Sequence, residues 1–188
     1  MFRRRPIRPR PGGPAGRVKV MLTRAHRMLA DGAYLPAGHC FEELAEGALR
    51  RRIPRAPFLF LQAGRGYLFG GEIEKGMGFL KRGLTLLADA ARWPELHRVG
   101  VRTAEDLTSR GYEKESRQIN EWIASVLPDN FDSNTTSLSD RVINRPVLPT
   151  HCPQCGAAVD PKAIAWMDEV TGECLYCGSP IRAASQVQ

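Results

Sequence analysis

The sequence has no long hydrophobic run, and this absence limits the classes of protein it can belong to. No window of the 188 residues approaches the roughly 18 uncharged apolar residues of a transmembrane helix. The longest apolar stretch, residues 57–71, contains Arg65 and four glycines. The basic start of the chain is not followed by the apolar segment of a secretory signal. We therefore expect a cytoplasmic protein with no membrane span.

Catalytic motifs are also missing. The sequence contains no P-loop, no G-x-S-x-G, no H-E-x-x-H and no dinucleotide-binding fingerprint. The four histidines show no spacing that would pair them as metal ligands. Cys40 has no identifiable Asn or Asp partner of the kind that a cysteine nucleophile uses, so a buried apolar role is favoured for it. These absences predict a protein that is not an enzyme.

Acidic residues are missing from the first part of the chain. Residues 1–19 carry seven basic side chains and no acid, whereas basic and acidic residues balance in the remainder. The net charge of +7 therefore describes the N-terminal segment, which argues against a broadly basic nucleic-acid-binding body. The Arg, Pro and Gly content of residues 1–17 predicts a disordered tail. This tail either improves solubility or contacts phosphate or an acidic surface.

Glycine recurs in the body of the chain at nearly constant spacing. Gly32, Gly71 and Gly111 are 39 and 40 residues apart, and apolar residues recur every three, four or seven positions on both sides of each. Glycine adopts the left-handed conformation that ends a helix without a steric penalty. The pattern predicts three helical hairpins over residues 18–127. The expected fold class is mainly α, a short α-solenoid of three helical hairpins followed by a small β zinc ribbon.

The hairpins resemble the tetratricopeptide-repeat family, which places small residues, an aromatic and a turn glycine at fixed offsets. The second hairpin matches with Gly64, Tyr67 and Gly71. Asn120 in the third replaces a usual aromatic, and the period near 40 exceeds the family's length of about 34 residues. The alternative is a helical bundle with coincidental glycine spacing. Gly76 in the second hairpin stands where the family usually has alanine. Further matches are Gly83 in the second hairpin, Ala25, Gly32, Tyr34, Ala37 and Phe41 in the first, and Ala104, Gly111 and Ser116 in the third.

The resemblance implies a concave face that binds another protein and is lined by the first helix of each hairpin. Apolar side chains interspersed with Lys19, Arg65 and Arg98 would suit an acidic or C-terminal peptide segment. Taken singly, Phe58 and Leu61 are explained better by packing in the core. The candidate groove residues are Lys19, Leu22, His26, Phe58, Leu61, Arg65, Phe69 and Arg98.

Four of the five cysteines form two C-x-x-C pairs, Cys152 with Cys155 and Cys174 with Cys177, and a glycine follows each pair. Two intervening residues let one tight turn direct both sulfurs at a single ion, so the two turns supply four thiolates in a tetrahedron. The spacing predicts one structural Zn²⁺ ion, because four protein ligands leave no open position for a substrate. Iron held by the same four thiolates is the alternative.

This C-terminal segment resembles the zinc-ribbon and rubredoxin-like families. Between the cysteine pairs we expect a β-hairpin with a strand at residues 164–166, a turn at residues 168–172 and Glu173 leading back. Roughly thirty residues cannot bury a sufficient core alone, so the metal is expected to contribute to folding. The predicted segments are a linker at residues 128–150, the zinc ribbon at residues 151–182 and a short tail at residues 183–188.

These features favour a non-enzymatic adaptor or scaffold that binds another protein and contains a structural zinc site. The alternative is a nucleic-acid-associated regulatory protein that uses the basic residues 1–17 and the zinc ribbon. Residues 128–188 carry four basic and seven acidic side chains, and this net negative charge argues against phosphate binding by the ribbon.

Overall fold

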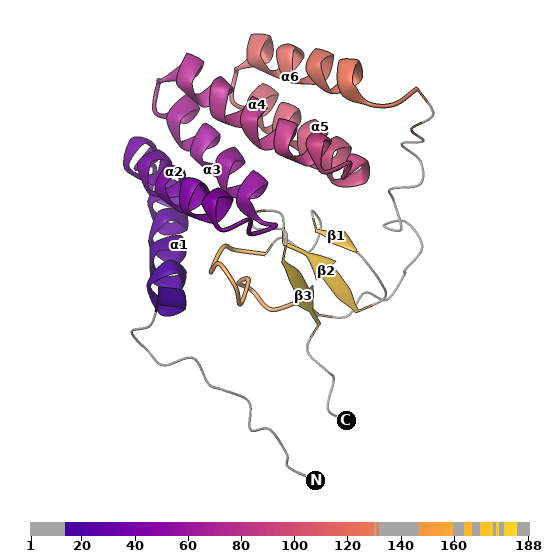
Figure 1. Ribbon diagram of the computed structural model, residues 1–188. Coiled ribbons are helices and arrows are strands. Elements are labelled where there is room, and N and C mark those ends of the chain that lie inside the picture. Colours follow the sequence, from indigo (N-terminus) through magenta and orange to yellow (C-terminus); the bar gives the residue numbers. More distant parts are fainter. Residues whose placement is uncertain are drawn as a thin grey trace.

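The computed structural model describes residues 14–129, 131, 147–159, 164–166, 170–174, 176 and 179–183. Most of the predicted tail and linker, the last five residues and Cys177 lie outside these ranges. Figure 1 shows six helices followed by three short strands in the described part of the chain. The helices are α1 (Pro14–Ala30), α2 (Tyr34–Arg50), α3 (Ala56–Phe69), α4 (Ile73–Asp89), α5 (Trp93–Ser109) and α6 (Glu113–Val126). The strands are β1 (Ala165–Trp166), β2 (Thr171–Glu173) and β3 (Pro180–Arg182).

The helices form three hairpins that stack in chain order. Each helix packs mainly on the helices that precede and follow it in the sequence (Figure 1). The predicted mainly α fold with three helical hairpins is therefore confirmed. The first helix begins at Pro14, four residues before the predicted start of the helical region. None of the described helices combines the length and the apolar character that a membrane crossing requires.

Each of the first five helices ends with the same turn. The second residue after the helix has a positive φ, and the next backbone N–H donates to a carbonyl five residues back. The N–H of Ala33, for example, lies 2.8 Å from the carbonyl oxygen of Met28. The structural unit is therefore one helix with its turn, and two units make the glycine period. The residues with positive φ are Gly32, Arg52, Gly71, Ala91 and Gly111.

The third helix is the centre of the stack and is buried on nearly all sides. Glycines permit this burial because they bring helix backbones close together. A Cβ atom at Gly66 would lie 2.6 Å from the Cα atom of Gly38 in α2, and one at Gly64 would lie 2.8 Å from the carbonyl oxygen of Gly76 in α4. The side chains on either side of α3 belong to two hydrophobic clusters. The helix thus joins the first hairpin to the rest of the stack.

The described residues between 147 and 183 form a small unit that we call the cysteine module. Its three antiparallel strands follow the order β1-β2-β3, with Trp166 opposite Gly172 and Gly172 opposite Ile181. The predicted turn at residues 168–172 is too long, because Thr171 and Gly172 belong to β2. Gly172 is explained by packing, since a Cβ atom there would lie 2.7 Å from the Ile164 side chain.

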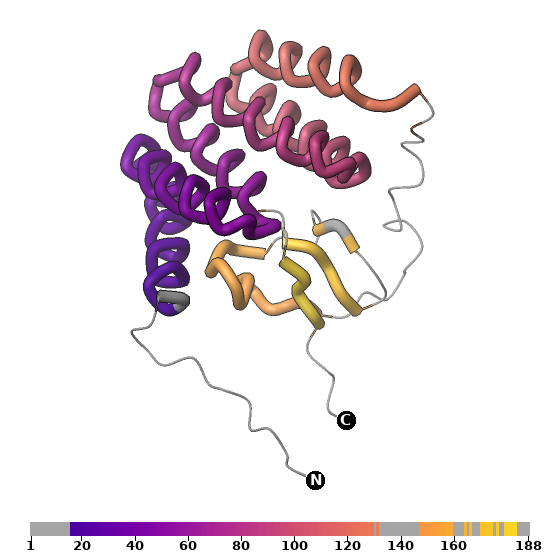
Figure 2. Tube along the Cα trace, in the orientation of Figure 1, coloured from indigo at the N-terminus to yellow at the C-terminus, as the bar shows by residue number. Residues whose placement is uncertain are grey.

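The module shares a hydrophobic core with the helices. Side chains of α1, α2 and α3 form one buried cluster with module residues that include Leu148, Ile164 and Ile181. Figure 2 shows the module, in orange and yellow, beside α1 and below α3 and α5. The described helices and the module are therefore packed together and are not two separate bodies joined only by the chain.

Candidate metal centre

The first cysteine pair lies in a tight turn that backbone hydrogen bonds close. The N–H of Cys152 donates to the carbonyl of Ala157 at 2.8 Å, and the N–H of Gly156 donates to the carbonyl of Cys152 at 2.8 Å. Gly156 has a φ of +77°, which glycine adopts without the strain that a Cβ atom would cause. The turn places Cys152 and Cys155 together in the interior of the module.

The second cysteine pair begins with the same hydrogen bond. The N–H of Cys174 donates to the carbonyl of Ser179 at 2.8 Å, so both turns close on the residue five positions after their first cysteine. Cys174 directly follows β2, and β3 begins directly after Ser179. The sheet therefore carries Cys174 to the first cysteine turn.

Three thiols meet between the two turns. The sulfur atoms of Cys152, Cys155 and Cys174 all lie within 4.8 Å of one another, and all three residues are buried. The sulfurs of Cys155 and Cys174 are 3.8 Å apart, much farther than the roughly 2.05 Å of a disulfide. A tetrahedral ion with metal–sulfur bonds of about 2.3 Å would hold its sulfurs about 3.8 Å apart. The three thiols thus fit a thiolate-bound metal ion.

The remaining two cysteines are Cys177 and Cys40. Cys177, the predicted fourth ligand, lies outside the described residues. Cys40 lies in α2, half-buried, with its sulfur 4.0 Å from the carbonyl oxygen of Met21. Burial raises the pKa of the Cys40 thiol, and the neighbouring Glu43 raises it further. A raised pKa keeps the thiol protonated and unreactive, which agrees with the predicted apolar role.

His26 of α1 packs between the helices and the module. Its ring centroid lies 4.9 Å from that of Phe41 in α2 and 5.3 Å from that of Tyr176 in the module. Burial lowers the pKa of His26 to about 4, although the nearby Cys152 acts in the opposite direction. The imidazole is therefore neutral at neutral pH, as its partly apolar surroundings require.

The two arginines Arg65 and Arg98 of the predicted groove both form ion pairs. Arg98 of α5 forms an ion pair with Glu173 of β2. Arg65 of α3 forms an ion pair with Asp106 of α5 at 3.4 Å, and burial lowers the pKa of its guanidinium. Burial also raises the pKa of the Glu173 carboxyl, and Arg98 opposes that rise. The module and helices thus meet through charged as well as apolar groups.

The other residues predicted for the groove have different surroundings. Leu22, Phe58 and Leu61 are only 1%, 2% and 1% exposed, so they pack in the hydrophobic cores and offer no surface to a partner. Lys19 is exposed on α1. Phe69 is half-buried, in contact with the rings of Tyr34 and Tyr112 and under the guanidinium of Arg110. The sequence analysis did not predict a role for Thr23, Gln62 or Asp106, and it predicted Glu173 only as the residue that leads back to the second cysteine pair.

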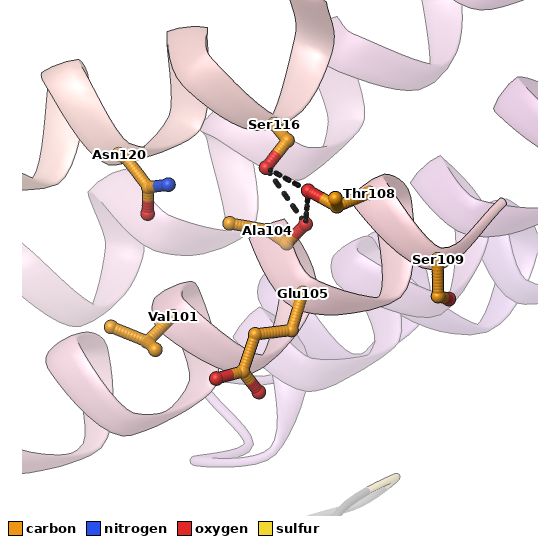
Figure 3. Close-up of a pocket in the computed structure, with 7 residues that line it drawn as sticks. All are labelled: Val101, Ala104, Glu105, Thr108, Ser109, Ser116 and Asn120. Carbon is orange, nitrogen blue, oxygen red and sulfur yellow. Dashed lines mark hydrogen bonds between the residues drawn. The ribbon is translucent and has the colours of Figure 1, made fainter. Parts of the chain in front are cut away.

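The last hairpin carries a hollow of about 470 Å³, shown in Figure 3. The hydroxyl of Ser116 donates to the carbonyl of Ala104 at 2.8 Å and lies 2.8 Å from the hydroxyl of Thr108 (Figure 3). None of the described residues that line the hollow is a histidine. The lining residues are Val101, Ala104, Glu105, Thr108, Ser109, Ser116 and Asn120.

Comparison with known proteins places the chain in no family. No family model, curated protein or solved structure matches it.

Proposed function

We propose that this protein is a non-enzymatic adaptor that binds other proteins through tetratricopeptide-like helical hairpins and contains one structural zinc ion. The observation that carries the proposal is the ordered stack of three hairpins with equivalent turns. Stacks of this kind present extended surfaces that bind peptides and proteins. Four of the six described helices have 17 residues. Two such helices already fill the family's repeat of about 34 residues and leave no residues for the turns. The hairpins are therefore longer members of this architecture.

We assign the fourth metal ligand to Cys177. Cys177 follows Cys174 by three positions, as Cys155 follows Cys152. The shared hydrogen bond at the start of each turn supports the same arrangement in both. Four thiolates suit Zn²⁺, and a closed tetrahedron leaves no position for water or substrate. When bound, the ion cross-links the two turns, which is a structural role.

A cytoplasmic location follows from this assignment. Thiolates must stay reduced to bind zinc, and the cytoplasm keeps thiols reduced. The sulfurs of Cys155 and Cys174 are 3.8 Å apart, so the cluster geometry suits an ion and not a disulfide.

Affinity capture of the full-length protein from its native host, followed by chemical cross-linking and mass spectrometry, tests the adaptor role. We expect a protein partner that cross-links to exposed helix lysines such as Lys75 and Lys81. Capture of a protein partner should survive about 0.3 M salt and removal of residues 1–17. Nucleic-acid binding by a basic tail would, in contrast, weaken steeply with salt. Recovery of nucleic acid alone, lost on either treatment, would instead support the nucleic-acid alternative.

A further inference from the structure

The cysteine module lies beside α1 and below α3 and α5 (Figures 1 and 2). Gly156 lies against α1 so closely that a Cβ atom there would be 2.8 Å from the hydroxyl oxygen of Thr23. Tyr176 contacts His26 of α1 edge to face and packs against the hydrophobic cluster that contains side chains of α3. The first helix of every hairpin therefore contacts the module, since Arg98 of α5 pairs with Glu173.

The residues that make these contacts are neighbours of the metal ligands in the sequence. Glu173 directly precedes Cys174, Tyr176 directly precedes Cys177, and Gly156 directly follows Cys155. A metal ion that fixes the four thiols also fixes these three neighbours. The strength of the contact between module and helices is thus coupled to metal binding.

The covered face has the chemistry of a recognition surface for an acidic segment. The side chains of Arg98 and Glu173 are only 25% and 11% exposed, so the pair is largely removed from water. A buried guanidinium without its carboxylate would be unfavourable, and Arg98 therefore requires an acidic partner whenever this face is covered. Gln62 and Arg65 lie three residues apart on one side of α3.

Two polar atoms of α1 and α3 are buried and have neither a hydrogen bond nor an ion pair in the described structure. They are the Nε2 atom of His26 and the Oε1 atom of Gln62, whose residues are 8% and 2% exposed. Buried polar atoms normally have partners, so these two mark a surface with unused hydrogen-bonding capacity. A peptide with polar groups can satisfy capacity that the module leaves open.

We propose that the face of α1, α3 and α5 recognises a protein segment with a carboxylate followed three positions later by an aromatic ring, and that Glu173 and Tyr176 occupy this face while the metal is bound. Loss of the metal removes the order of the small module and withdraws both side chains. The face then opens to an acidic, tyrosine-bearing segment of a partner. This inference rests on the proposed adaptor function and supplies its binding surface and its regulation.

Chemical labelling of histidine tests whether the module covers the face only when metal is bound. Full-length protein, loaded with zinc or treated with a chelator, is modified with diethylpyrocarbonate and analysed by mass spectrometry. We expect labelling of buried His26 to accelerate about fivefold or more on chelation, since local opening exposes it. Labelling of exposed His39, the control on α2, should stay unchanged. Equal protection of His26 in both states would overturn the proposal.

A peptide-binding experiment tests the recognition chemistry. The probe is a fluorescent peptide of residues 168–181 with Cys174→Ser and Cys177→Ser, which retains Glu173 and Tyr176. Chelated full-length protein should bind it about tenfold more tightly than zinc-loaded protein, and Arg98→Glu should weaken the binding to chelated protein about tenfold. A peptide with Glu173→Lys should recover affinity for the Arg98→Glu protein.

Arg117→Glu on α6 is the matched control, because Arg117 is exposed and lies outside the covered face. It should leave the affinity for the peptide unchanged. Absence of binding, or binding that ignores the metal or Arg98, contradicts the proposal. If the peptide fails this test but a partner is captured through other helices, only the recognition proposal fails and the adaptor function stands. Failure of the recognition proposal and failure of the adaptor function are therefore distinguishable.

Discussion

Protein with Cys155→Ser is expected to lose its bound zinc and the order of the cysteine module. Cys155 is fully buried, with its sulfur 3.8 Å from that of Cys174, so a hydroxyl there removes one thiolate from the centre of the cluster. Structural zinc supplies about 10–16 kcal/mol of binding free energy in small zinc-dependent domains, and this free energy is coupled to their folding. Helices α4 to α6 should keep their structure, because their cluster of buried side chains contains no residue of the module.

Elemental analysis and hydrogen exchange measure this outcome. Unaltered protein should contain one zinc ion per chain, and the Cys155→Ser protein should contain none. Cys40→Ser is the matched control, since Cys40 is a free thiol on α2 away from the cluster, and it should retain the zinc. Full zinc content in the Cys155→Ser protein would show that the metal ligands have been assigned wrongly. Iron in place of zinc would support the alternative metal.

Gly66→Ala is expected to be among the most destabilising single substitutions in the helical stack. A Cβ atom at Gly66 would lie 2.6 Å from both the Cα and N atoms of Gly38, and 3.0 Å from the carbonyl oxygen of Tyr34. These are backbone atoms, so α2 and α3 must separate to admit the methyl group. We expect a loss of about 3 kcal/mol in the free energy of unfolding. Thermal denaturation should show a melting temperature lower by roughly 6–12 °C.

Gly78→Ala is the matched control for that experiment. Gly78 lies in the middle of α4, is exposed, and would place its Cβ atom with no atom of another helix within 4 Å. Alanine there should stabilise the helix by about 0.5–1 kcal/mol, because it has less backbone freedom to lose on folding. If both substitutions lower the melting temperature equally, close packing of α2 on α3 does not explain the glycine at position 66.

The sequence predicted the hairpins because three of the five helix-ending turns contain glycine. Gly32, Gly71 and Gly111 mark these turns directly, and the apolar spacing on both sides identifies the helices. The other two turns place Arg52 and Ala91 in the same left-handed conformation, which non-glycine residues adopt at a cost. Arginine and alanine do not indicate a left-handed turn, so the sequence did not predict that one helix with its turn is the repeating unit.

The cysteine cluster was predictable for a different reason. The spacing within each pair is a local property, and a tight turn suffices to bring two thiols together. The meeting of Cys174 with the first pair depended on the three-stranded sheet, of which only the first strand and the return at Glu173 were expected. Strand β3 was missed because three residues, Pro180 to Arg182, are too few for a periodic pattern.

The covering of the helical face by the module was not predictable from local pattern. Arg98 and Glu173 are 75 residues apart, and neither has a neighbour in sequence that marks it as half of an ion pair. The concave side was therefore expected to hold a separate partner. The burial of Leu22, Phe58 and Leu61 in the cores arises from the same tight packing. Only the folded chain shows which surface remains for binding.

X-ray absorption spectroscopy of the zinc in the full-length protein tests most directly whether the metal centre is closed and structural. Four thiolates predict a shell of four sulfur atoms at about 2.3 Å, with no lighter ligand. The described cluster of Cys152, Cys155 and Cys174 supplies three of these sulfurs. A shell of three sulfurs with one oxygen or nitrogen at about 2.0–2.1 Å would contradict the account, because it would leave an open position of the kind that catalytic zinc uses.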